Sequence, residues 1–247
     1  MQRIRSISHP KVRKWKAFLS TGQVPDGCFL SDHFRVIYHA LTLGLVEELA
    51  VRENSNTALK FADHDNRYEI TNEVAGEIGL TVNAFAIIRK RPKRIRKYER
   101  ILLLDDVQDP FFLGTMMRTA RCFGFDGIFL TGNSIDQWEP AVGRLAQTNI
   151  FELPVERLSF QDAVKRLKRN HSVLVTPGSR KAVALEDIQP AEHMAVLLSG
   201  TGSFVPELCG HSDIICRVNP GFSDPALKSH EAAVIMYELR NLKGEQG

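Results

Sequence analysis

The sequence predicts an α/β protein whose C-terminal half is a parallel sheet with helices on both faces, preceded by a smaller α/β domain. After residue 100, short apolar segments alternate with helical patterns, which is typical of buried parallel strands joined by helices. Before residue 88, strand and helix patterns alternate over a stretch long enough for its own core. The run 89–100 is basic and contains Pro92. We therefore expect domains at 1–88 and 101–247, joined by a basic linker at 89–100.

The elements of the first half follow from local apolar patterns. Helices are predicted at 11–20, 34–45 and 71–78, and strands at 28–30, 47–51 and 82–88. In the helix at 34–45, Val36, Ala40 and Leu43 can share one face.

The second half has a more regular pattern. Strands are predicted at 101–104, 127–130, 150–154, 172–176, 194–198 and 214–218. Helices are predicted at 115–123, 160–168 and 226–242, the last with Ala232, Ile235, Leu239 and Leu242 on one stripe. In open parallel sheets, ligands bind at the carboxyl ends of the strands, so the site is expected there.

The composition is that of an ordinary globular protein, with 43% hydrophobic and 25% charged residues in a chain of 247. The chain contains no apolar run near the length of about 18 residues that a membrane span needs. Its basic start lacks the apolar core of a signal peptide, so we expect a cytoplasmic protein. Cys28, Cys122, Cys209 and Cys216 are scattered, which indicates reduced thiols and neither a disulfide nor a metal site.

Positive charge is concentrated in two places. Residues 1–16 contain six Lys or Arg and no acid, and residues 89–100 contain eight against Glu99, while the whole chain carries only +3. Such patches favour a polyanionic partner, namely a nucleic acid, whose phosphates they would neutralise. Trp15 and Tyr98 lie among these charges and offer stacking surfaces. The other interpretation is a solvated tail and a solvated linker.

Residues 102–132 are the best candidate for chemistry. The predicted strand ends in Asp105, Asp106 and Asp109, after which Pro110 fixes a turn and Gly114 allows close entry into a helix.

Arg118 falls one turn into that predicted helix, at the functional edge of the sheet. A guanidinium there can form a fork onto a phosphate or a carboxylate. A simple ion pair with Asp109 at the helix start is an equally good interpretation.

This segment resembles the first motif of the SpoU (TrmH-like) branch of the SPOUT RNA 2′-O-ribose methyltransferases. The matching residues are Asp109, Pro110, Gly114, Arg118, Thr119 and Ala120, followed by Phe123 and Gly124. Residues 6–16 and 28–45 look like the N-terminal substrate-binding domain of the family. Residues 150–155 look like its third strand, and residues 232–238 like the start of its final helix.

The resemblance implies a C-terminal sheet with a deep trefoil knot and a homodimer that binds S-adenosylmethionine. It also implies methyl transfer to a ribose 2′-hydroxyl of ribosomal or transfer RNA. Arg118 would then lie beside the reacting nucleotide as a catalytic residue. Because arginine rarely loses its proton, we interpret it as a phosphate clamp or electrostatic stabiliser. The residues expected to contact RNA are Arg3, Arg5, Lys11, Arg13, Lys14, Arg91, Lys93, Arg94, Arg96 and Arg118.

The second and third motifs of the family correspond to 199–205 and 217–227 but differ in sequence. Main-chain contacts to the cofactor survive a change of side chain, and the expected contact residues are Ser199, Gly200, Thr201, Gly202, Arg217, Gly221 and Ala226. Three polar motif positions are replaced: an Asn by Phe112, a Glu by Thr201 and an Asn by Leu227. Arg217 and Phe204 add bulky side chains near the expected cofactor.

These replacements leave alternatives open. One is a non-enzymatic RNA-binding protein that keeps the fold without the reaction. A more distant one is a Rossmann-like nucleotide-binding enzyme, since Gly200 and Gly202 resemble the start of a dinucleotide fingerprint that here lacks its third glycine. Ser223, Asp224, Ser229 and His230 are polar substitutes near the site. Helix capping explains Asp224 better, and a surface position explains His230 better. The sequence does not identify the RNA or the nucleotide.

Overall fold

The computed structural model describes residues 2–61, 67–178, 182–189, 191–200, 206–218 and 228–241. The chain forms two compact units, Met1–Arg91 with Trp138–Thr148 and Pro92–Gln137 with Asn149–Gly247. The boundary at 91/92 falls inside the basic run 89–100. The segment 138–148 packs with the first unit, although the sequence division grouped it with 101–247. Trp138 explains this, since its ring lies 5.0 Å from that of Phe29.

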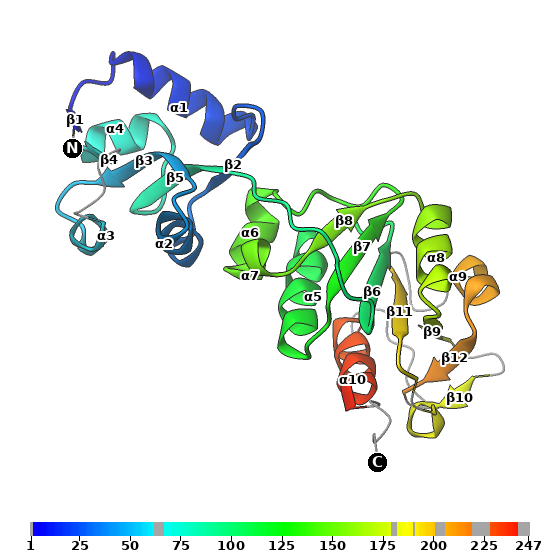
Figure 1. Cartoon of the computed structure of the whole chain (residues 1–247). Helices are drawn as coiled ribbons and strands as arrows, with labels where there is room; N and C mark the ends of the chain where they lie inside the picture. The colour runs from blue at the N-terminus through cyan, green and yellow to red at the C-terminus, as the bar shows by residue number, and fades with distance from the viewer. Residues whose placement is uncertain are drawn as a thin grey trace. The chain divides into compact units, whose positions relative to one another are not determined.

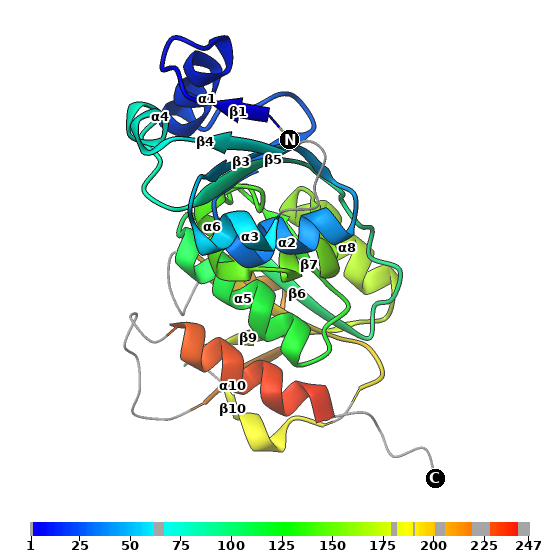
Figure 2. The same cartoon turned by 90° about the vertical axis from the view of Figure 1, so that its left-hand side faces the viewer.

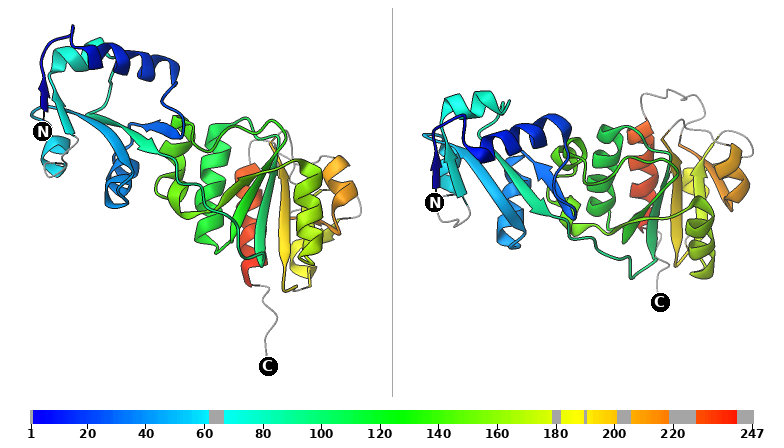
Figure 3. Two further views of the ribbon diagram at one scale, coloured as in Figure 1. Left: turned by 45° about the horizontal axis from the view of Figure 1, so that its top comes forward. Right: turned by 90° about the horizontal axis from the view of Figure 1, so that it is seen from above.

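The first unit contains a mixed sheet with the strand order β1-β4-β3-β5-β2. Its strands are β1 (Gln2–Ile4), β2 (Cys28–Ser31), β3 (Val46–Arg52), β4 (Arg67–Ile70) and β5 (Ala84–Arg89). Its helices are α1 (Pro10–Thr21), α2 (Phe34–Thr42), α3 (Asn56–Lys60), α4 (Asn72–Glu77) and α6 (Pro140–Ala146). Helices α1 and α4 cover one face of the sheet, and α2 lies on the other (Figure 3).

All the helices and strands predicted in the first half are confirmed, within a few residues at their ends. The sequence missed β1, α3 and β4. β1 lies in the basic N-terminal run, where Ile4 is the buried position, and it pairs in parallel with β4. β4 begins at Arg67, whose guanidinium is buried and donates to the carbonyl of Ala58. A charged residue at a buried position therefore concealed β4, whereas β1 has only one buried apolar residue and gives no apolar pattern.

The second unit contains, among the described residues, a parallel sheet with the order β10-β12-β9-β11-β6-β7-β8. Its strands are β6 (Arg100–Asp105), β7 (Gly127–Thr131), β8 (Val155–Arg157), β9 (Val173–Pro177), β10 (Val183–Ala184), β11 (Met194–Ser199) and β12 (Ile214–Arg217). Its helices are α5 (Pro110–Cys122), α7 (Asn149–Glu152), α8 (Phe160–Arg169), α9 (Pro206–His211) and α10 (Lys228–Asn241). Helices α5 and α10 pack side by side (Figure 2), and α8 and α9 cover the opposite face (Figure 1).

The parallel sheet covered on both faces is therefore confirmed. The strand predicted at 150–154 is wrong: residues 149–152 form helix α7, and strand β8 follows at 155–157. Ile150 and Phe151 are both buried, and a short buried apolar run fits a helical turn as well as a strand. The trefoil knot stays a prediction, because residues 201–205 and 219–227, between β11 and α10, lie outside the described residues.

The strand order places the edge at which a ligand is expected. From β6 the chain builds outward through β7 to β8 and then crosses to β9, beyond β6 on its other side. β11 later enters between β6 and β9. A reversal of this kind opens a crevice at the carboxyl ends of the strands, here those of β6 and β11. No helix in the described part of the chain is long and apolar enough to cross a membrane.

Candidate functional site

Three adjacent strands end together at this edge. Asp105 of β6 is in register with Thr131 of β7 on one side and with Ser199 of β11 on the other. The Thr131 hydroxyl donates a hydrogen bond of 2.6 Å to Oδ1 of Asp105. Thr131 and Ser199 are buried, so the edge has polar groups under the loops that follow the strands.

Gly200 brings the chain after β11 directly against the chain after β6. Its N–H donates to the carbonyl of Asp105 at 2.8 Å. A Cβ at Gly200 would lie 2.3 Å from the carbonyl oxygen of Asp106 and 2.5 Å from the Cα of Val107. No side chain fits there, so the position requires glycine. Ser199 and Gly200, the expected cofactor contacts that the structure describes at this strand end, thus lie beside the acidic end of β6.

Ser134 holds the loop between β6 and α5, and sequence reasoning missed it. Its hydroxyl donates to the carbonyl of Thr131 at 2.6 Å and accepts from the N–H of Val107 at 2.9 Å. The N–H of Ile135 closes the same loop onto the carbonyl of Val107 at 2.7 Å. Ser134 has no distinguishing sequence signal, because a serine three residues after a strand is common in any loop.

Asp109 is the N-cap of α5. Its carboxylate accepts from the N–H of Phe111 at 2.9 Å and from that of Phe112 at 3.3 Å, and Pro110 occupies the first helical position. The alternative of an ion pair between Asp109 and Arg118 is therefore wrong. Phe112 is only 8% exposed, so the side chain that replaces the asparagine of the motif packs in the interior.

Arg118 lies farther from the sheet edge than the sequence predicted. Helix α5 starts at Pro110 rather than near 115, so Arg118 is in its third turn and not one turn in. At 1.5 Å per residue it lies about 12 Å along the helix axis from the helix start. Its side chain is exposed, and within the described part of the chain it has no hydrogen-bond or ion-pair partner. The guanidinium is thus available to an external anion.

The other expected cofactor residues divide into two groups. Arg217 ends β12 and is exposed, so its side chain points to solvent. Thr201, Gly202, Gly221 and Ala226 lie outside the described residues, as do Phe204, Ser223, Asp224 and Leu227.

The remaining described polar candidates are on α10, and the buried thiol of Cys216 lies on β12. Ser229 is half-buried and His230 is exposed on α10. Burial raises the pKa of the neighbouring Cys216 thiol to about 12. This thiol therefore stays protonated at neutral pH and is no nucleophile.

The N-terminal candidates for RNA contact are mostly paired with acids. Lys11 and Lys14 form ion pairs with Glu48 at 3.3 and 2.9 Å, and Arg3 pairs with Glu69 at 2.9 Å. Arg5 and Arg13 are exposed and have no such partner among the described residues.

Trp15 does not offer a stacking surface. Its side chain is fully buried, and its indole N–H donates to Glu48 at 2.9 Å. The expected stacking surface is therefore wrong, because the Trp15 side chain lies in the hydrophobic core between α1 and the sheet.

The basic run 89–100 also divides by position. Arg91, Arg94 and Arg96 are exposed, whereas Lys93 pairs with Glu152 at 3.3 Å. Arg100 is 3% exposed and donates to the carbonyls of Leu239 and Glu192, each at 2.8 Å. Arg100 therefore holds the end of α10 on the sheet, and burial lowers its pKa.

Comparisons with known proteins agree with the motif at 109–120. Residues 99–201 match the model of the SpoU rRNA methylase family. The chain is 24% identical over 247 residues to the 23S rRNA (guanosine(2553)-2′-O)-methyltransferase RlmP of Bacillus subtilis, covering 97% of this chain and 100% of that protein. An uncharacterized tRNA/rRNA methyltransferase of Synechocystis is 32% identical over 172 residues, covering 63% of this chain and 62% of that one.

A solved structure gives the same result for the fold. The AdoMet-bound rRNA methyltransferase of Sinorhizobium meliloti superposes with a TM-score of 0.75 at 21% identity, over 97% of both chains. The family match covers β6 to β11 and therefore includes the strand ends, Gly200 and the capped helix α5 described above. Together with the Asp109-to-Ala120 motif, the family match over residues 99–201 and the full-length alignment support the assignment of the chain as a member of the SpoU (TrmH-like) family of SPOUT methyltransferases.

Proposed function

We propose that this protein is an S-adenosylmethionine-dependent RNA 2′-O-methyltransferase that acts on ribosomal RNA in the cytoplasm. The observation that carries the proposal is Arg118, which stands at its motif position with an exposed guanidinium and no partner among the described residues. The choice of ribosomal RNA is supported by the relative that aligns over its full length, a 23S rRNA guanosine 2′-O-methyltransferase.

The residues at the carboxyl edge fit a cofactor held mainly by main-chain groups. When bound, S-adenosylmethionine supplies an electrophilic methyl group on a sulfonium. Ser199 and Gly200 would hold it together with Thr201, Gly202, Arg217, Gly221 and Ala226. Gly200 leaves no side chain at the narrowest point of the edge, and the Arg217 side chain is directed to solvent. The bulky replacement Arg217 is therefore compatible with binding.

Arg118 would act on the acceptor nucleotide. A ribose 2′-hydroxyl is a poor nucleophile, so the site must fix its position and favour the negative charge that develops on its oxygen. A guanidinium can do both by binding the adjacent phosphate through a forked pair of hydrogen bonds. Because Phe112 is buried and carries no amide, this positioning depends more heavily on Arg118 here than where the motif retains its asparagine.

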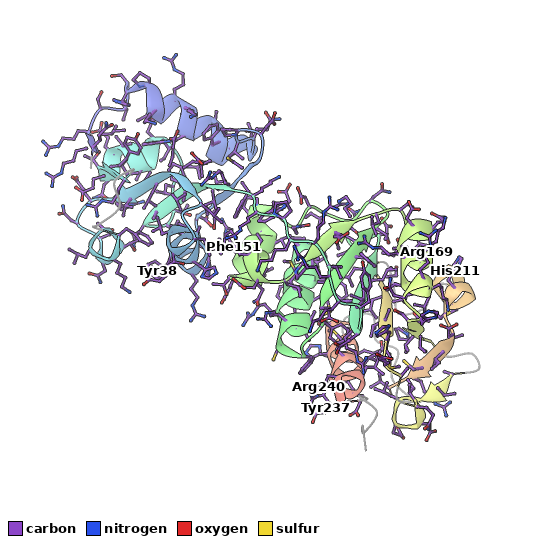
Figure 4. The ribbon with its side chains drawn as sticks, viewed as in Figure 1. Tyr38, Phe151, Arg169, His211, Tyr237 and Arg240 are labelled. Carbon is purple, nitrogen blue, oxygen red and sulfur yellow. The ribbon has the colours of Figure 1, made fainter. Side chains whose placement is uncertain are left out.

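The homodimer expected from the resemblance is part of this proposal. Helices α5 and α10 pack together and expose large apolar side chains: Phe111 at 58%, Val234 at 42% and Tyr237 at 45%. Tyr237 also makes an edge-to-face contact with Phe123, the C-cap residue of α5, and lies beside Arg240 (Figure 4). Exposed apolar groups on one pair of packed helices favour association with a second copy.

Methyl transfer from radiolabelled S-adenosylmethionine to an in vitro transcript of 23S rRNA tests the function. We expect incorporation at a ribose, and Arg118→Ala should lower kcat/KM by about 100- to 1,000-fold. Arg121→Ala, on the next turn of α5, is the matched control and should retain activity.

Calorimetric titration completes the test. Absence of binding at millimolar S-adenosylmethionine, together with absence of methyl transfer, would contradict the proposal.

A non-enzymatic RNA-binding role is the second candidate. It is favoured by the buried Phe112 at the asparagine position of the motif. The two candidates differ in one result: RNA binding without any S-adenosylmethionine binding would support the second.

A further inference from the structure

The basic linker is docked against the second unit. Ile95 is 4% exposed and shares a core with Ala163 and Leu167 of α8. Its N–H donates to Oε1 of Glu156 at 2.7 Å, and the other oxygen of Glu156 accepts from Arg166 of α8 at 2.6 Å. One carboxylate on β8 thus joins the linker to the helix.

Two further contacts fix the path of the linker. The Arg166 guanidinium lies 5.5 Å from the ring centre of Tyr98, which in turn packs on Phe129. A Cβ at Gly127 would lie 2.5 Å from Cγ1 of Ile95, so a glycine at the start of β7 makes room for the linker. The linker therefore runs beside α8 at the amino ends of the strands.

Helix α8 turns a basic stripe outward beside this linker. At 100° per residue, Lys165 and Arg169 lie opposite the buried Ala163 and Leu167, and Arg166 lies on the flank that reaches Tyr98. Figure 4 labels Arg169 on α8. Lys168 lies on the other flank and pairs with Asp213 at 2.5 Å.

Within the second unit, five exposed cations of the linker and α8 have no acidic partner among the described residues. We name them the linker–α8 surface: Arg94, Arg96, Lys97, Lys165 and Arg169. The dipole of α8 accounts for a cation in its last turn, such as Arg169, but not for Lys165 or for the linker residues.

We infer that the linker–α8 surface binds phosphates of the RNA at a place remote from the reacting nucleotide. This inference rests on the proposed function for the identity of the polyanion. The cations are carried by docked backbone, so less ordering entropy is lost on binding than from a free linker. The linker lies at the amino ends of the strands, whereas Asp105 and Gly200 mark their carboxyl ends. A strand of six residues separates these edges by about 20 Å.

Because the two edges are far apart, we expect substitutions in the linker–α8 surface to weaken RNA binding without changing the rate of the chemical step. Filter binding would use an in vitro transcript of 23S rRNA over a range of salt concentrations, with two double variants, Arg94→Gln with Arg96→Gln and Lys165→Gln with Arg169→Gln. Each double variant should weaken binding by about tenfold and flatten the slope of log K against log salt by about 1.5. KM for the transcript should rise while kcat at saturating RNA stays unchanged.

The matched control is Lys16→Gln with Lys168→Gln, which removes two cations that are paired with Glu77 and Asp213. If either double variant behaves like this control, the inference is overturned. It is also overturned if the wild-type protein binds neither the transcript nor bulk tRNA at low salt. Loss of affinity in both double variants of a protein that never transfers methyl groups would support the surface and reject the proposed function.

Discussion

Position 200 requires glycine, because the backbone of Asp106 and Val107 fills the space in which a Cβ would lie. Asp106 itself adopts a left-handed backbone conformation, with φ of +51°, at this contact. The two strand ends that approach here carry the acidic loop before α5 and the start of the expected cofactor segment. A single residue thus sets the spacing of the edge.

Gly200→Ala should lower the free energy of unfolding by about 1–3 kcal/mol, because one of the two backbones must move. It should also weaken S-adenosylmethionine binding, since Ser199 and the residues after it would shift. Urea unfolding and calorimetric titration measure the two effects.

Gly76→Ala is the control for this change. A Cβ at Gly76, in α4, meets nothing within 4 Å, and alanine is the better helix former, so stability should stay the same or rise. Equal behaviour of the two variants would show that the strand ends are not in close contact.

Among the elements, α1 is held to the sheet by the buried side chains of Val12 and Trp15 and by one carboxylate on β3. Glu48 accepts from the indole of Trp15 and pairs with Lys11 and Lys14 of α1. Burial raises the pKa of Glu48, but the hydrogen bonds from Trp15 and Lys14 and the charge of Lys11 outweigh it and hold the pKa below the ordinary 4.5. Lys11 and Lys14 of α1 therefore stabilise the fold through Glu48 and are not freely available to bind RNA.

Glu48→Gln should therefore lower the free energy of unfolding by about 1–3 kcal/mol at pH 7. Since the folded pKa is depressed, the contribution of the carboxylate is complete above pH 4.5 and is lost as the pH falls through the folded value. The difference between wild type and variant should shrink accordingly in urea unfolding below pH 4.5.

Glu77→Gln, which removes an exposed ion pair with Lys16, is the comparison and should cost less than about 1 kcal/mol. A Glu48→Gln penalty that does not change with pH would argue against an ionised Glu48 as the link to α1.

The elements also show where a single sequence is informative. The strands β6, β9 and β11 were predictable because both faces of each are covered, so their apolar runs are continuous. The start of α5 was misplaced by five residues, although Asp109 followed by Pro110 is a typical helix start. Helix α7 was wrongly predicted as a strand. It has only four residues, which is too short for the apolar pattern to distinguish a helix from a strand.

At the scale of the whole molecule, the exposed apolar side chains of α5 and α10 predict self-association. Tyr237→Glu should convert a dimer to a monomer in sedimentation velocity experiments, because a carboxylate would be buried at the interface. The far-ultraviolet circular dichroism should not change, since Tyr237 is 45% exposed in the single chain.

Tyr38→Glu, on α2 of the first unit, is the matched control, because Tyr38 is 52% exposed and belongs to neither helix. It should leave the dimer intact. A wild-type protein that sediments as a monomer at micromolar concentration would refute the prediction.

The sequence by itself determined the parallel sheet, the motif from Asp109 to Ala120 and the two basic segments, because all three are local patterns. It could not determine which cations are available. Only the tertiary structure paired Lys11 and Lys14 with Glu48, buried Arg100 under α10 and left Arg118 exposed in the third turn of α5. The reason is physical: a charge is defined by its residue type, but its partners come from distant strands and helices that meet only in the fold.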